Sequence, residues 1–110
     1  MANTSLNSDR YRYISIDTAP GASGAWSDAV SMSAVKGGPI WFSRRGGGNG
    51  TVTIQYKTKW DTEWRDLTTD VDLADGVRCI LDDMGAGVAW RAGIKSGGYT
   101  DGTIIVGFDW

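Results

Sequence analysis

The chain has 110 residues, 41% of them apolar and 22% charged, with sixteen glycines, six tryptophans and a net charge of −2. This length and composition predict a single core and exclude a wholly disordered chain. Eleven basic residues against thirteen acidic ones lack the cationic excess that nucleic-acid binding requires, so nucleic acid is not an expected partner.

The single cysteine and the first ten residues bear on the compartment. One cysteine, Cys79, cannot form an internal disulfide, which favours folding in a reducing cytoplasm. The opening "MANTSLNSDR" has neither the basic start nor the apolar stretch of a secretory signal. No segment approaches the length of apolar sequence that spans a membrane, so we expect no membrane partner.

Short β-forming runs recur along the whole chain, and no stretch has the apolar periodicity of a helix. Glycine, proline, asparagine and aspartate separate these runs, as is typical of turns. We therefore expect an all-β protein. Residues 1–10 are expected to be a flexible N-terminal arm, which can order on a neighbouring subunit, and residues 11–110 to be a single β-sandwich domain.

Three strands are expected in the first half of the chain. Residues 10–17 alternate in polarity, and residues 25–35 fit a strand with Trp26 on its apolar face. Residues 39–45 begin with a proline, which fits a strand start or a sheet edge. The glycine-rich segment 46–50 is the strongest turn signal in the sequence.

The middle of the chain contains the clearest alternation. Residues 51–58 predict a half-buried antiparallel strand with Val52, Ile54 and Tyr56 facing inward. A polar turn then separates Trp60 from Trp64, which opens the next strand. A short strand over residues 77–81 follows an acidic loop.

The last two β-forming runs, 88–95 and 103–110, each place apolar residues on one face. We expect them to pair as an antiparallel hairpin, with Ile94 opposite Ile104 and every core-facing partner apolar. A slip of one residue would turn all these side chains toward water, so the register should be strongly specified. The final strand is thus expected to be an integral sheet member, with Trp110 in the core.

About eight short strands, with turns roughly every eight to twelve residues, predict an antiparallel β-sandwich. The sandwich is expected to be immunoglobulin-like or jelly-roll-like. A small barrel is the less favoured alternative.

Residues 49–67, "NGTVTIQYKTKWDTEWRDL", and residues 89–108, "AWRAGIKSGGYTDGTIIVGF", together form a recognisable pattern. They resemble small structural proteins encoded in tailed-bacteriophage genomes, in which a "GTVTLQ" strand leads to a tryptophan-containing turn and a "YRxGVKxGxYTSGTVxV" hairpin closes the chain. The resemblance covers residues 49–110. One departure is Trp90, which stands where those proteins tend to have tyrosine.

This resemblance implies a virion component, on the capsid surface as a head decoration or cementing protein and assembled in the host cytoplasm. The expected partners are the major capsid protein or other virion proteins, and a homo-oligomer is expected. A neck, tail or fibre subunit of the virion is an alternative. A carbohydrate-binding module for host attachment is another, because exposed aromatic rings stack on sugars.

The sequence offers no catalytic signature. The chain has no histidine, which excludes histidine triads and most zinc sites. Cys79 alternates with apolar residues and is expected to be a buried structural thiol. Acidic residues at 70, 72, 75, 82 and 83 do not have the spacing of a helix-loop-helix calcium site, so a solvated loop is expected. We expect no enzymatic activity, no cofactor and no metal.

Tryptophan and arginine are common anchors of protein interfaces, and they supply the candidate interface here. Alternation assigns Trp26, Trp90 and Trp110 to the core. The remaining aromatic candidates bracket a polar turn or lie beside Phe42, and two arginines precede the glycine-rich turn as a basic tip. The candidate interface residues are therefore Trp41, Arg44, Arg45, Trp60 and Trp64.

Overall fold

A computed structural model describes residues 3–31, 40–71, 78–81 and 88–110. These residues form strands and loops, and no helix occurs among them. Every strand pair is antiparallel.

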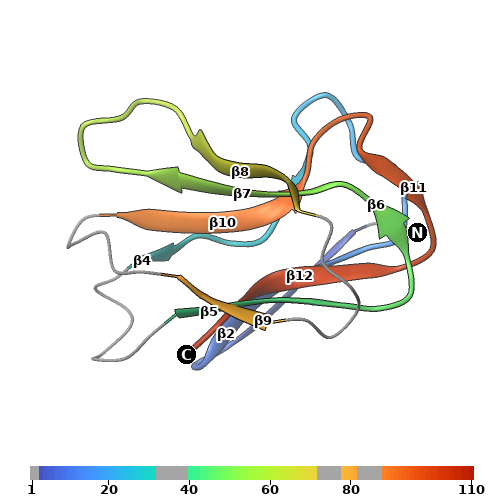
Figure 1. The fold of residues 1–110 in the computed structure, drawn as a ribbon, viewed down its shortest axis with the longest axis horizontal. Coiled ribbons are helices and arrows are strands. Elements are labelled where there is room, and N and C mark those ends of the chain that lie inside the picture. Colours follow the sequence, from blue (N-terminus) through green and yellow to red (C-terminus); the bar gives the residue numbers. More distant parts are fainter. Residues whose placement is uncertain (1–2, 32–39, 72–77, 82–87) are drawn as a thin grey trace.

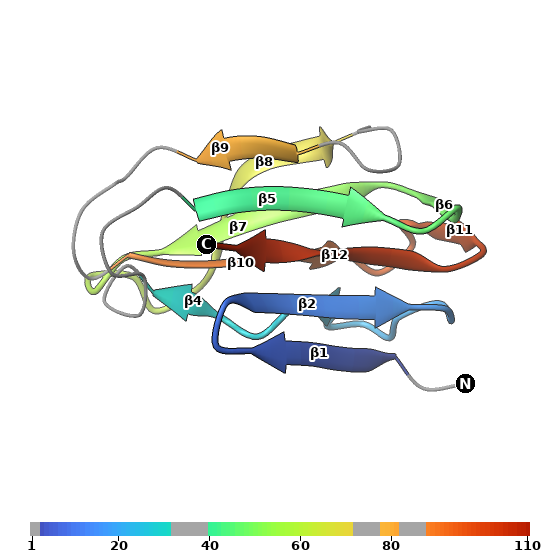
Figure 2. The same ribbon diagram turned by 90° about the horizontal axis from the view of Figure 1, so that it is seen from below.

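Two larger sheets form the two layers of the molecule (Figures 1 and 2). The first sheet has the order β1 (Thr4–Ser8), β2 (Tyr11–Ile16), β12 (Ile104–Asp109), β5 (Ile40–Arg45) and β9 (Arg78–Leu81). The second has the order β3 (Ala25–Trp26), β10 (Ala89–Ile94), β7 (Val52–Lys57) and β8 (Arg65–Val71), and β4 (Val30–Ser31) also pairs with β10. A small third sheet joins β11 (Tyr99–Asp101) to β6 (Asn49–Gly50).

The two layers enclose one apolar core, to which both contribute alternate residues. Phe42 and Phe108, neighbours in the first sheet, meet edge to face with ring centroids 5.9 Å apart. Trp90 of the second sheet is 1% exposed. The described core residues are Ile14, Ile16, Ala25, Val30, Phe42, Val52, Ile54, Val88, Trp90, Ala92, Ile94, Ile104, Val106 and Phe108. The all-β antiparallel sandwich expected from the sequence is confirmed.

The expected hairpin between the last two runs is wrong. β10 pairs with β7, β3 and β4 in the second sheet, whereas β12 lies between β2 and β5 in the first. The connection crosses between layers through β11, with turns at Gly97 and Gly102, whose φ angles are 85° and 75°. Two strands that face each other across a core show the same alternation as two that pair, so the pattern could not separate these arrangements.

The expected role of the final strand is correct in its essentials. β12 is the central strand of the first sheet, and Ile104, Val106 and Phe108 are fully buried. Trp110 packs against the core as a partly buried residue, and its backbone N–H donates to the carbonyl of Arg10 at 3.0 Å.

Residues 25–35 differ from the single strand expected. β3 and β4 are separated at Ser27, whose backbone N–H donates to the carbonyl of Ala92 at 2.8 Å and whose hydroxyl accepts from the N–H of Ala92 at 3.0 Å. Trp26 consequently lies outside the core and is only partly buried. Residues 32–35 of this expected strand lie outside the described part of the chain.

The N-terminal segment also differs from the expected flexible arm. Residues 4–8 form β1, which pairs with β2 in a continuous register from Thr4 opposite Ser15 to Ser8 opposite Tyr11. The amide oxygen of Asn3 accepts from the backbone N–H groups of Asp17 at 3.0 Å and Thr18 at 3.2 Å. Residues 3–8 are therefore part of the sandwich.

Candidate protein-interaction site

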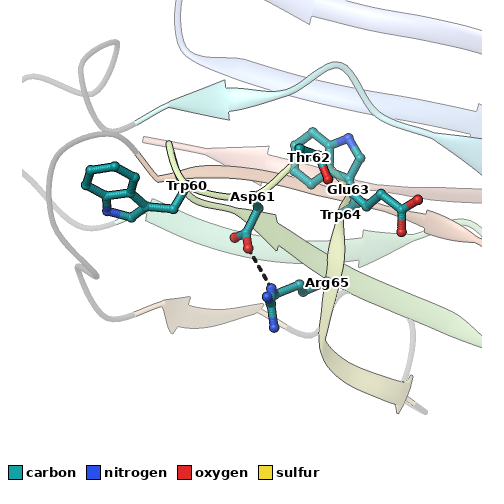
Figure 3. Close-up of a pocket in the computed structure, with 6 residues that line it drawn as sticks. All are labelled: Trp60, Asp61, Thr62, Glu63, Trp64 and Arg65. Atoms are coloured by element: carbon teal, nitrogen blue, oxygen red, sulfur yellow. Dashed lines mark hydrogen bonds and ion pairs between the residues drawn. The ribbon is translucent and has the colours of Figure 1, made fainter.

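The connection between β7 and β8, residues 58–64, carries the most exposed large apolar side chain among the residues described. We call it the Trp60 loop. Trp60 is 82% exposed. An open hollow of about 250 Å³ lies beside it (Figure 3) and is lined by Trp60, Asp61, Thr62, Glu63, Trp64 and Arg65.

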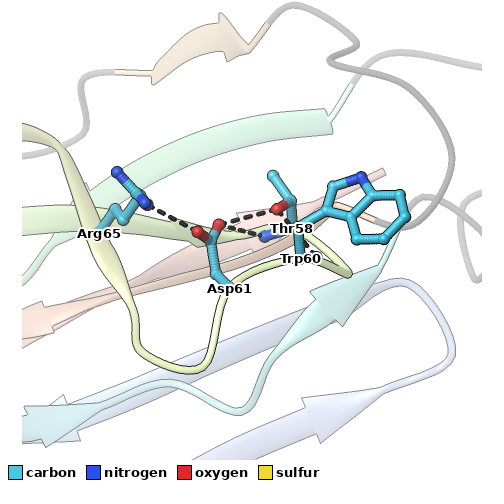
Figure 4. A network of polar contacts seen from close by, with 4 residues as sticks. All are labelled: Thr58, Trp60, Asp61 and Arg65. Carbon is cyan, nitrogen blue, oxygen red and sulfur yellow. Dashed lines mark hydrogen bonds and ion pairs between the residues drawn. The ribbon is translucent and has the colours of Figure 1, made fainter.

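Asp61 holds the Trp60 loop in one conformation (Figure 4). Its Oδ2 accepts from the backbone N–H of Thr58 at 3.0 Å and from the Thr58 hydroxyl at 2.8 Å. Its Oδ1 accepts from Nε of Arg65 at 2.7 Å. The N–H of Asp61 donates back to the Thr58 carbonyl at 3.1 Å, and the N–H of Trp60 donates to the Thr58 hydroxyl at 3.2 Å. The loop is thus closed on itself by hydrogen bonds.

The same contacts fix the charge of Asp61. The backbone hydrogen bond from Thr58, followed by the hydrogen bond from Arg65, lowers the pKa of the Asp61 carboxyl to about 2. The hydrogen bond to Asp61, followed by the negative charge of Asp61, raises the pKa of Arg65. Both groups are charged at neutral pH, and both oxygens of the carboxylate accept hydrogen bonds, one from Thr58 and the other from Arg65.

The Trp60 indole therefore has the features of an interface anchor. It projects from a loop whose backbone is already ordered, so a partner that buries it would lose little loop entropy on binding. The ammonium of Lys59 lies 5.0 Å from the ring centroid. Tryptophan is enriched at the centres of protein interfaces, where one such side chain commonly carries a large share of the binding energy.

Trp64, at the other end of the loop, is placed differently. The guanidinium carbon of Arg91 lies 4.5 Å from the centroid of the Trp64 ring and 4.4 Å from that of Trp26. We call these three side chains the Trp–Arg stack. Arg91 also donates from Nε to Gln55 at 2.8 Å. Trp64 is thereby part of the covering of the second sheet and is not a free platform.

Sequence reasoning missed the Trp–Arg stack. Arg91 lies between two core residues of β10, so alternation alone would have placed it on the outer face beside other outward residues. Its partners are Trp26 in β3 and Trp64 at the end of the Trp60 loop, and nothing in the sequence pairs those segments. Partial burial lowers the pKa of Arg91. Gln55 links it to Asp66 with a 2.9 Å hydrogen bond, and hydrogen bonds from Lys95 and Gln55 lower the pKa of Asp66.

The expected basic tip at Arg44 and Arg45 needs correction. Arg44 is only 6% exposed, because it lies opposite Val106 on the core-facing side of β5, and its Nη2 donates to the carbonyl of Gly48 at 2.9 Å. Arg45 is exposed on the other side of the strand. The structure therefore leaves Arg45 as an accessible candidate and removes Arg44 from the surface.

Trp41 is half-buried on the outer face of the first sheet, opposite Asp109 in the register. On the same face the rings of Tyr11 and Tyr13 stack with centroids 5.3 Å apart, and the Tyr13 hydroxyl lies 2.9 Å from the Ser43 hydroxyl. Burial raises the pKa of Tyr13. The five candidate residues are thus spread over the two layers and the core, and the structure does not bring them together.

Within the described ranges there is no group of three or more acidic or cysteine side chains arranged to hold a metal ion. The side chain of Cys79 and the acidic positions 70, 72, 75, 82 and 83 lie outside the side chains that the structure describes. The part of the chain with assigned structure also has no helix of the length and apolar character needed to cross a bilayer.

No protein-family model matches this chain, and no curated protein sequence does. Among solved structures it is similar to the cupin domain of CENP-C from Drosophila melanogaster, with 8% identity and a TM-score of 0.44 over 97% of this chain and 69% of that one. A second structure of the CENP-C domain from the same fly gives 10% identity and a TM-score of 0.41 over 97% and 71% of the two chains. At these TM-scores the likeness supports no conclusion about this protein.

Proposed function

We propose that this protein is a structural component of a tailed-bacteriophage virion, a decoration protein that binds the assembled head and stabilises it. The resemblance of residues 49–110 to phage structural proteins supports the class. The observation that carries the binding role is the Trp60 indole, 82% exposed on a loop that Asp61 holds in place. We assign the contact with the capsid to the Trp60 loop.

A protein partner fits the Trp60 loop better than a sugar does. Sugar sites combine a stacking ring with polar groups that are available to the sugar hydroxyls. Here both oxygens of Asp61 already accept hydrogen bonds from Thr58 and Arg65. The loop presents one large indole rimmed by the exposed polar side chains of Lys59, Thr62 and Glu63, and an aromatic anchor with a polar rim suits a pocket on a protein surface.

The proposed mechanism is stabilisation by mass action. A protein that binds the assembled shell and not the free subunits stabilises the shell by RT ln(1 + [L]/Kd), about 2.7 kcal/mol per site at a hundredfold excess over Kd. Repetition of the site over a symmetric shell multiplies this small term. The role requires no catalysis, cofactor or metal.

Co-sedimentation with empty expanded heads, built from the major capsid protein of the same genome, tests the proposal. The wild-type protein should pellet with the heads and saturate at a fixed ratio. The Trp60→Ala variant should bind roughly 30-fold more weakly or worse, the effect of losing an interface hot spot of about 2 kcal/mol. The matched control is Leu67→Ala, since Leu67 is 40% exposed on the neighbouring strand β8; it should bind like the wild type.

Three outcomes would overturn the assignment. Equal binding by the wild type and Trp60→Ala would remove the Trp60 loop from the contact. Binding to purified tails or necks, with none to heads, would favour a neck, tail or fibre subunit. Quenching of Trp60 fluorescence by cell-surface glycans, with no binding to any virion part, would favour a carbohydrate-binding module.

A further inference from the structure

The first sheet ends at β1, and in the described part of the chain no strand pairs with the far side of β1. Figure 2 shows β1 as the outermost strand, beyond β2. The outer side of such a strand presents backbone N–H and C=O groups in the geometry that accepts another strand. Soluble proteins usually block these edges.

Three devices that block sheet edges, namely proline, charge and an irregular register, are absent from β1 itself. Its sequence, "TSLNS", has no proline and no charged residue, and its register with β2 runs without a shift. The β8 edge of the second sheet is different. β8, "RDLTTDV", contains three charged residues and its pairing with β7 is irregular at two places. Charges and irregular register are what protects an edge from pairing.

Side-chain hydrogen bonds fix β1 at both of its ends. Asn3 accepts three hydrogen bonds from Asp17 and Thr18 at 3.0 to 3.2 Å. At the turn, the Ser8 hydroxyl accepts from the N–H of Arg10 at 3.1 Å. An edge strand that is already straight and fixed loses little entropy when a second strand pairs with it.

Exposed apolar groups gather beside this edge. Leu6 is 37% exposed and lies opposite Tyr13, on the outer face of the sheet. Tyr11, which stacks on Tyr13, is 36% exposed. Strand pairing at the edge would bring a second set of these side chains alongside the first and cover part of this apolar surface.

We propose that β1 is a dimerisation edge, which pairs antiparallel with β1 of a second copy of this chain about a two-fold axis at Leu6. In this register Leu6 faces Leu6 of the partner, Ser5 faces Asn7, and Thr4 faces Ser8. The strand itself carries no charge, and the Asn7 amide of each copy donates to the carboxylate of Asp28 at 2.6 Å. The two five-stranded sheets become one continuous sheet.

A second copy is the occupant that this register favours, since an uncharged strand is compatible with itself, whereas a charged partner strand would gain nothing from it. Two five-residue strands bury less surface than the roughly 1,000 Å² that a stable complex requires. The dimer should therefore be weak and concentration-dependent. The inference depends on the sheet edge alone. A failure of the proposed capsid contact would leave this inference unaffected, because the Trp60 loop belongs to the other sheet.

Sedimentation velocity of the full chain, in reducing buffer so that Cys79 cannot link two copies, tests this inference. The wild type should shift from monomer to dimer as its concentration rises toward about 1 mM. Leu6→Lys and Leu6→Glu should each weaken the dimer roughly tenfold or more, because like charges then meet on the axis. An equimolar mixture of the two variants should dimerise again.

Leu67→Lys is the matched control, since it places the same charge on an exposed leucine at the edge of the second sheet. It should dimerise like the wild type. Circular dichroism and melting curves verify that all variants are folded. A wild type that stays monomeric, a Leu6→Lys variant that still dimerises, or a mixture that fails to recover association would each overturn the inference. The wild type binding an unrelated strand peptide without self-association would assign the edge to a foreign partner.

Discussion

Trp60 and Trp64 flank the same turn, yet their surroundings differ in kind. The Trp64 ring has the guanidinium of Arg91 at 4.5 Å and the ammonium of Lys57 at 5.9 Å, and both cations belong to strands of the second sheet. The Trp60 ring extends beyond the sheet and is 82% exposed. A tryptophan fixed against sheet residues contributes to stability. A tryptophan that extends away from the sheet contributes little to the free energy of unfolding, and we therefore assign binding to Trp60.

This comparison implies a gradient of stability effects around the second sheet, from the core through the Trp–Arg stack to the Trp60 loop. The largest effect belongs to Trp90, which is 1% exposed and faces the core. Trp90→Ala should lower the free energy of unfolding by about 3 to 5 kcal/mol, because truncation removes apolar contacts and leaves a cavity. Urea unfolding followed by circular dichroism measures this. A loss below that of the Arg91 variants would contradict the gradient.

A medium effect is expected in the Trp–Arg stack. Arg91→Ala removes two cation–π contacts and the hydrogen bond to Gln55, and should cost about 1 to 2 kcal/mol in urea unfolding. Arg91→Lys keeps the charge but not the flat guanidinium, so it should recover only part of the loss. An unchanged urea midpoint in Arg91→Ala would mean that Trp64 is as free as Trp60.

The contribution of Asp61 in the Trp60 loop to the free energy of unfolding should depend on pH. Asp61 has a pKa of about 2 in the folded chain, below its ordinary value of 3.8, so its ionised form contributes stability above that ordinary value. This contribution should disappear as the pH falls through the folded pKa. The stability difference between the wild type and Asp61→Asn should therefore shrink from about pH 5 to about pH 2, while the contribution of Asp66 cancels between the two proteins. Carboxyl NMR titration of Asp61 near 3.8 would contradict the hydrogen-bond scheme.

The smallest effect on stability should come from the residue with the largest proposed effect on binding. Trp60→Ala should change the free energy of unfolding by no more than about 0.5 kcal/mol, as is usual for exposed residues. The tryptophan emission spectrum of this variant should lack the contribution of the most exposed indole, which checks that Trp60 is solvent-exposed in the folded protein. A destabilisation comparable with that of Arg91→Ala would show that the indole has a structural role, and the division between the two tryptophans would fail.

Alternation predicted the core well because it depends only on one face being apolar. It placed Ile104, Val106 and Phe108 inside, and it placed Trp90 with them. It could not identify strand neighbours, since pairing and facing strands have the same pattern, and so the hairpin of the last two runs was wrong. Pairing is decided by the crossing connection through β11, which no local pattern specifies.

The candidate site was predictable in part for the same reason. Trp60 was found because it borders a polar turn, and polar turns lie at the surface. Arg44 was misplaced because the glycine-rich turn suggested exposure, while its position two residues after Phe42 puts it on the core side. Trp26 and Arg91 could be understood only once β3 and β10 were seen to pair, with Trp26 opposite Gly93.

The measurement that tests the account most directly is cryo-electron microscopy of empty heads with and without added protein. We expect extra density on the outer surface of the shell, with the sandwich oriented so that residues 58–64 contact the capsid and Trp60 is buried in it. Heads that show no added density, or a bound sandwich whose Trp60 loop faces solvent, would contradict the proposed role.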